Sequence, residues 1–308
     1  MRYTLRQLAY FVAAGEAGSI LKASENIHVS QPSISNAISQ LEDTFGVQLF
    51  IRHHAQGMSL TTAGREFFRE AKILLSNAEQ LQGFAGELSN KIIGTIEVGC
   101  FIPLAPIVTP DLCHGFMTGH PETDVRVREA HQADLLQLLR QGSIDLALTY
   151  DLQLQSDIDF IPLASLPPYV LLAADDPMSL AKSIAIENLA DKPMILLDLP
   201  LSSEYFMGIF SNCKIKPTIK ARTRLTDVQR GLVASGHGYS LANVRPLNQQ
   251  ALDGKSLCYV PLKGKHPTLT LGLALLKSTR KSQAQVAFID YCRSIVSDNK
   301  IPGMTTGF

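Results

Sequence analysis

Residues 19–45 read SILKASENIHVSQPSISNAISQLEDTF, and they contain two short helix patterns on either side of a tight turn. In the first pattern, Ile20, Ala23 and Ile27 recur at the spacing of one helix face. The hydroxyl of Ser19 precedes them and can cap the first free amides of a helix. This short face predicts a helix of about two turns.

The second pattern starts at Ser30 and Gln31. Ser30 is predicted to cap the new helix, and Pro32 is tolerated in the first turn because its missing amide hydrogen had no partner there. Four apolar residues then fall on one stripe: Ile34, Ile38, Leu41 and Phe45. The two patterns together predict a helix-turn-helix.

The other face of the second helix is polar and uncharged. It carries Ser33, Ser35, Asn36, Ser39 and Gln40. Short donors and acceptors of this kind read base edges in the major groove of DNA, whereas charged side chains mostly contact phosphates. An ordinary solvated surface helix has the same appearance, and this helix alone does not separate the two interpretations.

Neighbouring residues extend the pattern. The run SQPSIS at 30–35 is followed in register by Leu41-Glu42, Phe45-Gly46, Leu49-Phe50, Arg52 and SLTTAG at 59–64. This series resembles the DNA-binding signature of LysR-type transcriptional regulators, with Phe45 where leucine is usual and Ala55 where a second basic residue is frequent. The resemblance extends over essentially all 308 residues and, with the polar face, indicates these DNA-binding residues: Gln31, Pro32, Ser33, Ser35, Asn36, Ser39, Arg52 and His53.

The flanking segments complete a winged domain. Upstream, a supporting helix capped by Thr4 is predicted from Leu5, Leu8, Ala9, Phe11 and Val12. Downstream, residues 49–52 and 58–60 predict a two-stranded wing that holds Arg52 and His53 near the DNA backbone or minor groove, while Thr61 caps the next helix. We therefore expect a winged helix-turn-helix domain at residues 1–61.

Residues 62–88 predict a long helix with a strict heptad seam. The seam consists of Phe67, Ala71, Leu74, Ala78, Leu81, Ala85 and Leu88. A stripe this narrow and regular favours pairing with a second copy of the same helix, so residues 62–91 are predicted to form a linker and dimerisation helix. The family resemblance further implies a homotetramer and makes RNA polymerase a candidate partner.

After residue 94, strand and helix patterns alternate, which predicts parallel sheet with helices on both faces. Strands are expected at 95–99, 124–128, 144–149, 169–174, 194–197, 218–221, 239–242 and 269–275, and helices at 104–118, 133–141, 203–211, 227–234 and 283–296. The resemblance implies two lobes crossed twice by the chain, as in type II periplasmic solute-binding proteins. The whole is then an α+β multi-domain fold, with an effector-binding domain at 92–308: lobe I at about 92–163 and 268–300, lobe II at about 164–267.

Ligands of open α/β sheets bind beyond the carboxyl ends of strands, where helix N-termini offer amides to an anion. Applied here, and in agreement with the resemblance, this rule gives these effector-binding residues: Cys100, Phe101, Ile102, Ser202, Ser203, Leu225, Thr226 and Asn243. We expect a small organic acid held by amides and hydroxyls. Ser202 and Ser203 also fit a simple helix cap, and Phe101 also fits a core residue.

Composition sets further bounds. The net charge is zero, with 28 basic and 28 acidic residues, so a DNA-binding surface must concentrate its basic groups locally or act as an oligomer. Five cysteines are scattered without a C-x-x-C pair, and neither a disulfide framework nor a metal or cofactor site is predicted. No membrane-spanning or secretory segment is recognised, so we expect a cytoplasmic protein.

These observations favour a sequence-specific transcriptional regulator that binds double-stranded promoter DNA under the control of an effector. The alternative is a solute-binding module whose N-terminal helices serve only for oligomerisation. An enzyme is not predicted, because G-x-S-x-G, a phosphate-binding loop and H-E-x-x-H are all missing from the sequence. Arg222, Arg224, His237 and the basic run at 277–281 are interpreted as solvated positions.

Overall fold

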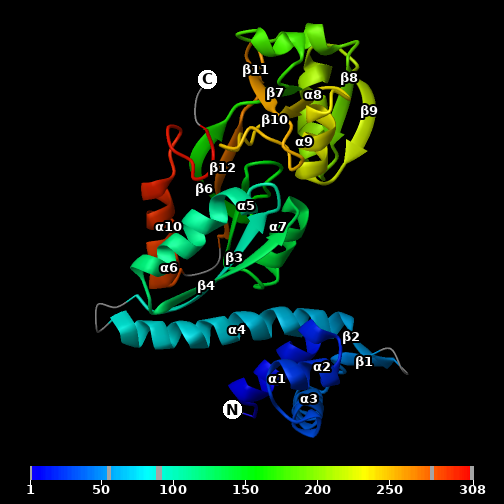
Figure 1. Cartoon of the computed structure of the whole chain (residues 1–308). Helices are drawn as coiled ribbons and strands as arrows, with labels where there is room; N and C mark the ends of the chain where they lie inside the picture. The colour runs from blue at the N-terminus through cyan, green and yellow to red at the C-terminus, as the bar shows by residue number, and fades with distance from the viewer. Residues whose placement is uncertain (1, 54–56, 88–91, 278–280, 306–308) are drawn as a thin grey trace. The chain divides into compact units, whose positions relative to one another are not determined.

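The computed structural model describes residues 2–53, 57–87, 92–277 and 281–305, with side chains for all of these except residue 76 and residues 79–87. The chain divides into two compact units. Unit 1 comprises Met1–Gly94 with Arg140–Ser143, and unit 2 comprises Thr95–Leu139 with Ile144–Phe308 (Figure 1).

Unit 1 contains the predicted helices α1 (Leu5–Ala17), α2 (Ile20–Asn26) and α3 (Gln31–Phe45). Thr4 and Gln7 form a reciprocal capping box at the start of α1, and Ser19 Oγ accepts from Lys22 N at 3.4 Å at the start of α2. At α3 the predicted capping hydrogen bond is not formed. Ser30 occupies the N-cap position, but its hydroxyl bonds the hydroxyl of Ser33 at 2.8 Å instead of a backbone amide.

The core of unit 1 lies between α1 and α3. Leu8 and Phe11 pack there against Ile34, Ile38 and Leu41, which confirms three of the four residues of the predicted α3 stripe. The fourth is different: Phe45 is 41% exposed. Its ring instead lies against the rings of Tyr3 and Phe67, because it stands on the last turn of α3 where the core ends.

The wing consists of β1 (Phe50–His53) and β2 (Gly57–Leu60), paired antiparallel. The carboxylate of Glu42 joins the wing to α3, because its Oε1 accepts from Leu49 N at 2.7 Å and from Phe50 N at 3.1 Å. The long helix α4 (Thr62–Glu87) then begins, and Thr61 Oγ1 caps it by accepting from Gly64 N at 2.8 Å, as predicted.

The residues of the predicted heptad seam of α4 differ in their surroundings. Phe67 packs in the core of unit 1 against Phe11 and Phe45, and Ala71 is buried in the same core. These two positions pack within the chain's own fold, and their assignment to a dimer interface stays a prediction. Leu74 is 39% exposed and Ala78 is half-buried. The side chains of Leu81 and Ala85, and residue Leu88, lie outside the described part of α4.

One lobe of unit 2 is built on a five-stranded sheet in the order β4-β3-β5-β12-β6. Its strands are β3 (Gly94–Phe101), β4 (Thr123–Ala130), β5 (Leu146–Tyr150), β6 (Ile158–Leu166) and β12 (Leu269–Leu276). Its helices are α5 (Ala105–Thr109), α6 (Gly115–Gly119), α7 (Gln132–Arg140) and α10 (Gln283–Ile295). A π-helical turn, Pro110–His114, joins α5 to α6 within the single helix predicted at 104–118, since Pro110 brings no amide hydrogen.

The second lobe contains two smaller sheets, ordered β10-β7-β11 and β8-β9. Its elements are β7 (Tyr169–Ala173), β8 (Pro193–Leu197), α8 (Ser202–Asn212), β9 (Thr218–Thr223), α9 (Thr226–Ala234), β10 (Ser240–Ala242) and β11 (Leu257–Pro261), with 3-10 turns at Pro177–Leu180 and Ile186–Leu189. Figure 1 shows α8 and α9 beside β8. The core between α8 and β8 contains Leu196, Phe206 and Phe210, whereas Val233 of α9 packs with Ile195 of β8 in a second core.

The prediction of parallel sheet holds for the pairs β3/β5 and β8/β9. It is wrong for β12, which runs antiparallel to both β5 and β6, and for β7, which runs antiparallel to β10 and β11. Strands β6 and β11 were not predicted. They are the strands that precede the two passages between lobes, β6 to β7 and β11 to β12, and pairing with distant β12 and β7 fixes them rather than a local pattern.

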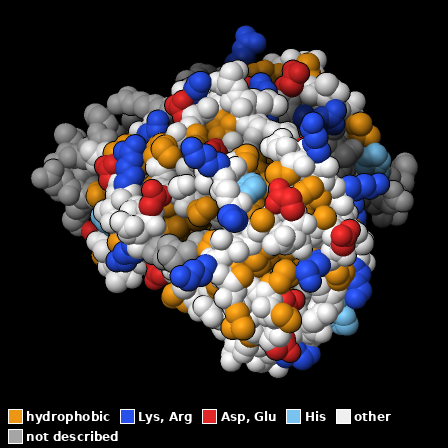
Figure 2. All heavy atoms as spheres, turned by 90° about the horizontal axis from the view of Figure 1, so that it is seen from above, with side chains coloured by type: hydrophobic (Ala, Val, Ile, Leu, Met, Phe, Trp, Pro, Cys, Tyr) orange, Lys and Arg blue, Asp and Glu red, His pale blue; other side chains and the backbone are white. Residues whose placement is uncertain are grey.

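Charges are mixed on the surface shown in Figure 2, which looks down on Figure 1 from above. Basic and acidic side chains are scattered there among apolar ones. This agrees with the zero net charge of the chain.

Candidate functional site

The polar face of α3 is exposed while its apolar face is buried. Gln31, Pro32, Ser33 and Asn36 are exposed, and Ser35 and Ser39 are half-buried. Among the side chains that the structure describes, Ser35, Asn36 and Ser39 have no hydrogen-bond partner in the protein. Their donors and acceptors are therefore available to a ligand in a groove of DNA.

Other residues near this face are already engaged. Ser33 shares its hydroxyl bond with Ser30, and Gln40 Oε1 accepts from Gln7 Nε2 of α1 at 2.6 Å. On the wing, Arg52 and His53 are exposed on β1, and the His53 ring bonds Ser59 Oγ at 2.8 Å across the hairpin. The guanidinium of Arg52 is thus the exposed cation of the described wing, beside a histidine held by the hairpin itself.

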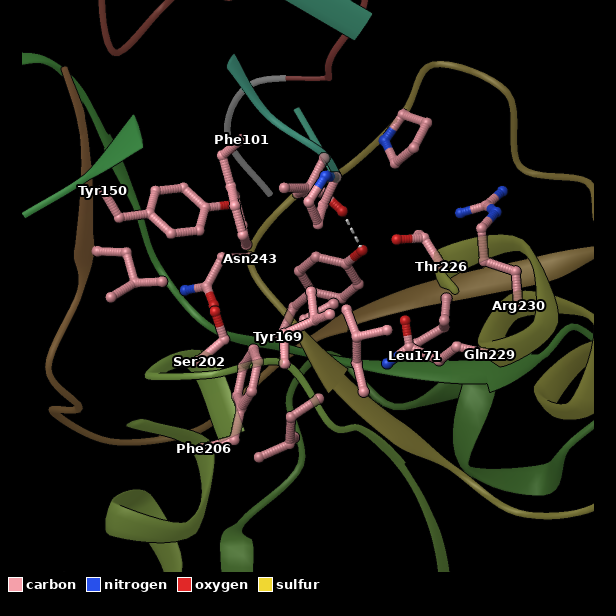
Figure 3. A pocket seen from close by; sticks show the side chains of 18 residues that line it. Phe101, Tyr150, Tyr169, Leu171, Ser202, Phe206, Thr226, Gln229, Arg230 and Asn243 are labelled. Atoms are coloured by element: carbon pink, nitrogen blue, oxygen red, sulfur yellow. Dashed lines mark hydrogen bonds between the residues drawn. The ribbon is translucent and has the colours of Figure 1, made fainter. Parts of the chain in front are cut away.

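Unit 2 contains a pocket with an empty volume of about 520 Å³ (Figure 3). Its walls come from both lobes: Phe101 and Tyr150 end β3 and β5, while Tyr169 and Leu171 belong to β7. Most of the lining is apolar or aromatic. An apolar and aromatic lining with a few polar groups is typical of small-molecule sites.

Four of the eight predicted effector-binding residues line this pocket: Phe101, Ser202, Thr226 and Asn243. The other four do not. Cys100 is fully buried on the opposite face of β3 from Phe101, because successive side chains of a strand point to opposite sides, and Ile102 is exposed in the turn that follows β3. Ser203 and Leu225 are outside the lining, and Leu225 is 61% exposed.

The sequence also left lining residues unrecognised. Tyr150 lies one residue past the predicted strand at 144–149, so a longer strand would have included it. Gln229 and Arg230 follow Thr226 by three and four positions on α9, which is the spacing of one helix face. Tyr169 and Phe206 were expected only as strand and helix residues, and nothing local indicates that they face a ligand site.

The buried polar groups of the pocket wall form a hydrogen-bonded frame. Gln229 Nε2 donates to Ser240 Oγ at 2.6 Å. Arg230 donates from Nη1 to Tyr259 Oη at 3.0 Å and from Nη2 to the carbonyls of Asn248 and Gln250 at 2.7 and 3.0 Å. These bonds fix the guanidinium against neutral oxygens, so its charge is not cancelled by a bonded carboxylate.

A second set of bonds connects the pocket to the passages between lobes. Asn243 Nδ2 donates to the carbonyl of Leu166 at 2.7 Å and to Tyr205 Oη at 3.2 Å. Tyr205 Oη in turn donates to the carbonyl of Pro267 at 2.5 Å. Leu166 ends β6, and Pro267 precedes β12, so Asn243 and Tyr205 are bonded to both passages. Burial raises the pKa of Tyr205 to about 12, against a smaller lowering by the bond from Asn243.

Burial also raises the pKa values of Tyr150 and Tyr169 above their usual range. Both phenols therefore stay neutral at physiological pH. No aspartate or glutamate belongs to the pocket lining, whereas Arg230 does. The described wall is in consequence electropositive in formal charge.

The described residues contain no group of three or more His, Cys, Asp or Glu side chains that could hold a metal ion. Among the helices that the structure describes, none combines the length and the apolar character that crossing a bilayer requires.

Comparison with known proteins gives two family matches. Residues 5–65 match the bacterial regulatory helix-turn-helix protein, lysR family, and residues 89–296 match the LysR substrate binding domain. The HTH-type transcriptional regulator CfxR of Cupriavidus necator is 30% identical over 254 residues, which cover 82% of this chain and 79% of that protein.

Two solved structures are similar over nearly the full length. HinK, a LysR family transcriptional regulator from Pseudomonas aeruginosa, is 37% identical with a TM-score of 0.64, covering 95% of this chain and 98% of that one. A full-length OxyR variant from Pseudomonas aeruginosa is 27% identical with a TM-score of 0.74, covering 94% and 97%.

Proposed function

This chain belongs to the LysR family of transcriptional regulators, and from that premise we propose that it reads promoter DNA with α3 and responds to a small organic acid in the pocket of unit 2. As a member of the family it is a DNA-binding regulator with a helix-turn-helix and a substrate-binding domain. The observation that carries the reading role is the uncharged set of Ser35, Asn36 and Ser39 on α3, of which Asn36 is exposed, the two serines are half-buried, and none is bonded to another described residue.

In this proposal α3 enters the major groove and the wing contacts the backbone. Ser35 and Asn36 present short donors and acceptors to base edges, and Gln31, Pro32, Ser33 and Ser39 complete the same face. Arg52 acts on phosphate through its charge, with His53 beside it. Glu42 supports both parts, because its carboxylate fixes the start of the wing to α3.

For the effector we propose the pocket end formed by Thr226 and Arg230 as the place of the carboxylate. Thr226 starts α9, where backbone amides carry partial positive charge, and Arg230 is a buried cation in the same lining. Since both Nη atoms of Arg230 already bond protein oxygens, it acts on an anion mainly through its charge. The hydroxyl of Thr226 supplies a direct bond.

The signal would pass through Asn243 and Tyr205. An effector that contacts Asn243 changes the bonding of a side chain tied to Leu166, and Tyr205 continues this network to Pro267. Binding would thereby favour one arrangement of the lobes over another, which is a population shift. We propose no chemical turnover of the effector.

We further propose a dimer paired through α4 from Leu74 onward, assembling to a tetramer in the cytoplasm, with RNA polymerase as a partner at the promoter. Leu74 supports the pairing because this large apolar residue of the seam is 39% exposed, whereas Phe67 and Ala71 pack within the chain.

The test is a mobility-shift assay with the intergenic DNA beside the gene, with and without candidate acids. Sequence-specific retardation that changes with an acid is expected. A variant lacking residues 1–60 should keep ligand binding and lose retardation, whereas retardation absent from the intact chain would refute the regulator proposal and leave a solute-binding module.

A further inference from the structure

Two buried polar atoms of the pocket have no partner. Ser202 is 3% exposed and Asn243 is 4% exposed, and both line the pocket. Among the described residues, neither Ser202 Oγ nor Asn243 Oδ1 has a hydrogen-bond partner. A buried polar atom without a partner is costly, so such atoms indicate a ligand or a water molecule that is bonded there.

The orientation of the Asn243 amide is fixed by its surroundings. Its Nδ2 lies 2.7 Å from the carbonyl oxygen of Leu166. Exchanging the two ends of the amide would bring Oδ1 against that carbonyl, and two acceptors at this distance repel each other. The unpaired atom is therefore the acceptor Oδ1, which requires an N–H or O–H group from its partner.

The neighbouring donors of the wall are already used by the protein. Gln229 Nε2 bonds Ser240, the Nη atoms of Arg230 bond Tyr259 and two carbonyls, and Asn243 Nδ2 bonds Leu166 and Tyr205. The Tyr169 hydroxyl donates to the Val244 carbonyl, shown by the dashed line in Figure 3. The hydroxyl of Ser202 does not bond Asn243 Oδ1 either, so this oxygen requires a hydrogen-bond donor from the ligand.

The two unpaired atoms belong to one end of the pocket. Tyr205 accepts from Asn243 and stands three residues after Ser202 on α8, so both lining residues adjoin the first turn of that helix. The surrounding lining is aromatic: Phe101 and Tyr150 come from one lobe, and Phe206 follows on α8. Figure 3 shows the Tyr150 and Phe206 rings flanking the region of Ser202 and Asn243. Aromatic rings favour offset or edge contacts with another flat ring.

We propose that the effector is an aromatic acid whose ring carries a hydroxyl or amino group, and that Asn243 Oδ1 accepts a hydrogen bond from that group. Ser202 Oγ bonds the same group, donating its hydrogen to a ring hydroxyl oxygen or accepting the second N–H of a ring amino group. This rests on the proposed effector role of the same pocket. The carboxylate lies toward Thr226 and Arg230, the ring lies among Phe101, Tyr150 and Phe206, and the ring substituent satisfies the two unpaired atoms. The donor group of the effector then contacts Asn243, whose amide is bonded to Leu166 at the end of β6, where the chain passes to the second lobe.

The test uses the full chain in calorimetric titrations with benzoate and with its hydroxy, amino and methoxy derivatives at each ring position. The methoxy compounds keep the size and the oxygen of the hydroxy compounds but have no donor hydrogen. We expect at least one hydroxy or amino isomer to bind about 10-fold tighter, or more, than its methoxy counterpart, because the methoxy compound leaves the buried acceptor Asn243 Oδ1 unpaired.

Two serine variants provide the matched pair. Ser202→Ala should reduce the hydroxy-to-methoxy ratio at least about threefold, because Ser202 Oγ donates to the ring hydroxyl in the same position in which that hydroxyl donates to Asn243, a position from which the methyl group of the methoxy compound is excluded. Ser203→Ala, at the neighbouring half-buried residue outside the lining, should leave the ratio as in the unmodified chain. Ser202 Oγ has no protein partner, so its removal breaks no bond of the fold, and the ligand series on the unmodified chain tests the proposal without any variant.

Equal affinity for hydroxy and methoxy compounds, or a ratio unchanged in Ser202→Ala, would overturn the donor recognition. No binding by any ring acid, while promoter DNA is still retarded, would overturn the aromatic class and leave the regulator proposal intact. Failure of DNA retardation alone would instead count against the proposed function.

Discussion

Replacement of Glu42 by alanine should detach the wing from the recognition helix. The carboxylate of Glu42 accepts from Leu49 N at 2.7 Å and from Phe50 N at 3.1 Å, and these two residues are 0% and 3% exposed. A hydrogen bond to a charged group contributes about 1.5–3 kcal/mol, and a buried amide left unpaired costs about 1–3 kcal/mol. Allowing for water that reaches the vacated site, we expect a local loss of about 2–4 kcal/mol.

Hydrogen exchange of the full chain, followed by mass spectrometry on peptides that contain residues 49–50, measures this loss. Each 1.4 kcal/mol corresponds to about a tenfold change in an equilibrium constant, so exchange at these amides should accelerate roughly 30-fold or more. Glu42→Gln keeps an acceptor oxygen and should show a smaller increase. Asp43→Ala removes an exposed neighbouring carboxylate and should leave the exchange unchanged.

DNA affinity should fall with the exchange protection, because the wing and α3 would no longer be held in one geometry. Unaltered protection of the Leu49 and Phe50 amides in Glu42→Ala would refute this account of how the wing is positioned.

Four other outcomes are expected. Asn36→Ala should relax sequence preference by about 1–3 kcal/mol in competition binding, while Arg52→Ala should weaken all sequences alike and flatten the salt dependence; identical behaviour would contradict the separate roles. Leu74→Lys should give a smaller species in sedimentation, and an unchanged mass would exclude Leu74 from the interface. At pH 8 an alkylating agent should label Cys213 first in native protein, since Cys213 is exposed whereas burial raises the pKa of Cys113 to about 12; peptide mass spectrometry identifies the site. Folding raises the pKa of Tyr205 from an ordinary 10.0 to about 12, so its contribution to stability is complete below pH 10 and is lost as the pH rises toward 12. The free energy of unfolding of Tyr205→Phe should therefore decrease less between pH 10 and pH 12 than that of the unmodified chain.

The local patterns of the sequence were sufficient for unit 1. Helical spacing and capping residues gave α1, α2 and α3, and the antiparallel wing followed from two short apolar runs. Such signals succeed because caps and apolar stripes act over three or four residues. They did not show that Phe45 lies at the edge of the core, or that Phe67 and Ala71 pack against it, since burial there depends on which distant surface covers a side chain.

In the pocket of unit 2, too, the sequence identified some residues and missed others. The rule for strand ends found Phe101, Ser202, Thr226 and Asn243, each at the end of a predicted element, but it also selected Cys100, Ile102, Ser203 and Leu225, because sequence spacing does not say which neighbour faces the cavity. Tyr150 was missed because the predicted strand ended one residue too early, and Tyr169 and Phe206 were missed because no local pattern indicates that they face the cavity.

The sequence by itself determined the family, the helix-turn-helix and the approximate ends of most strands, since these depend on residues close together in the chain. Only the tertiary structure decided which polar atoms of the pocket remain unpaired. Asn243 and Leu166 are 77 residues apart, and the bond between them exposes one specific acceptor to the ligand. Hydrogen-bond satisfaction is a property of atoms brought together by folding, and no local pattern encodes it.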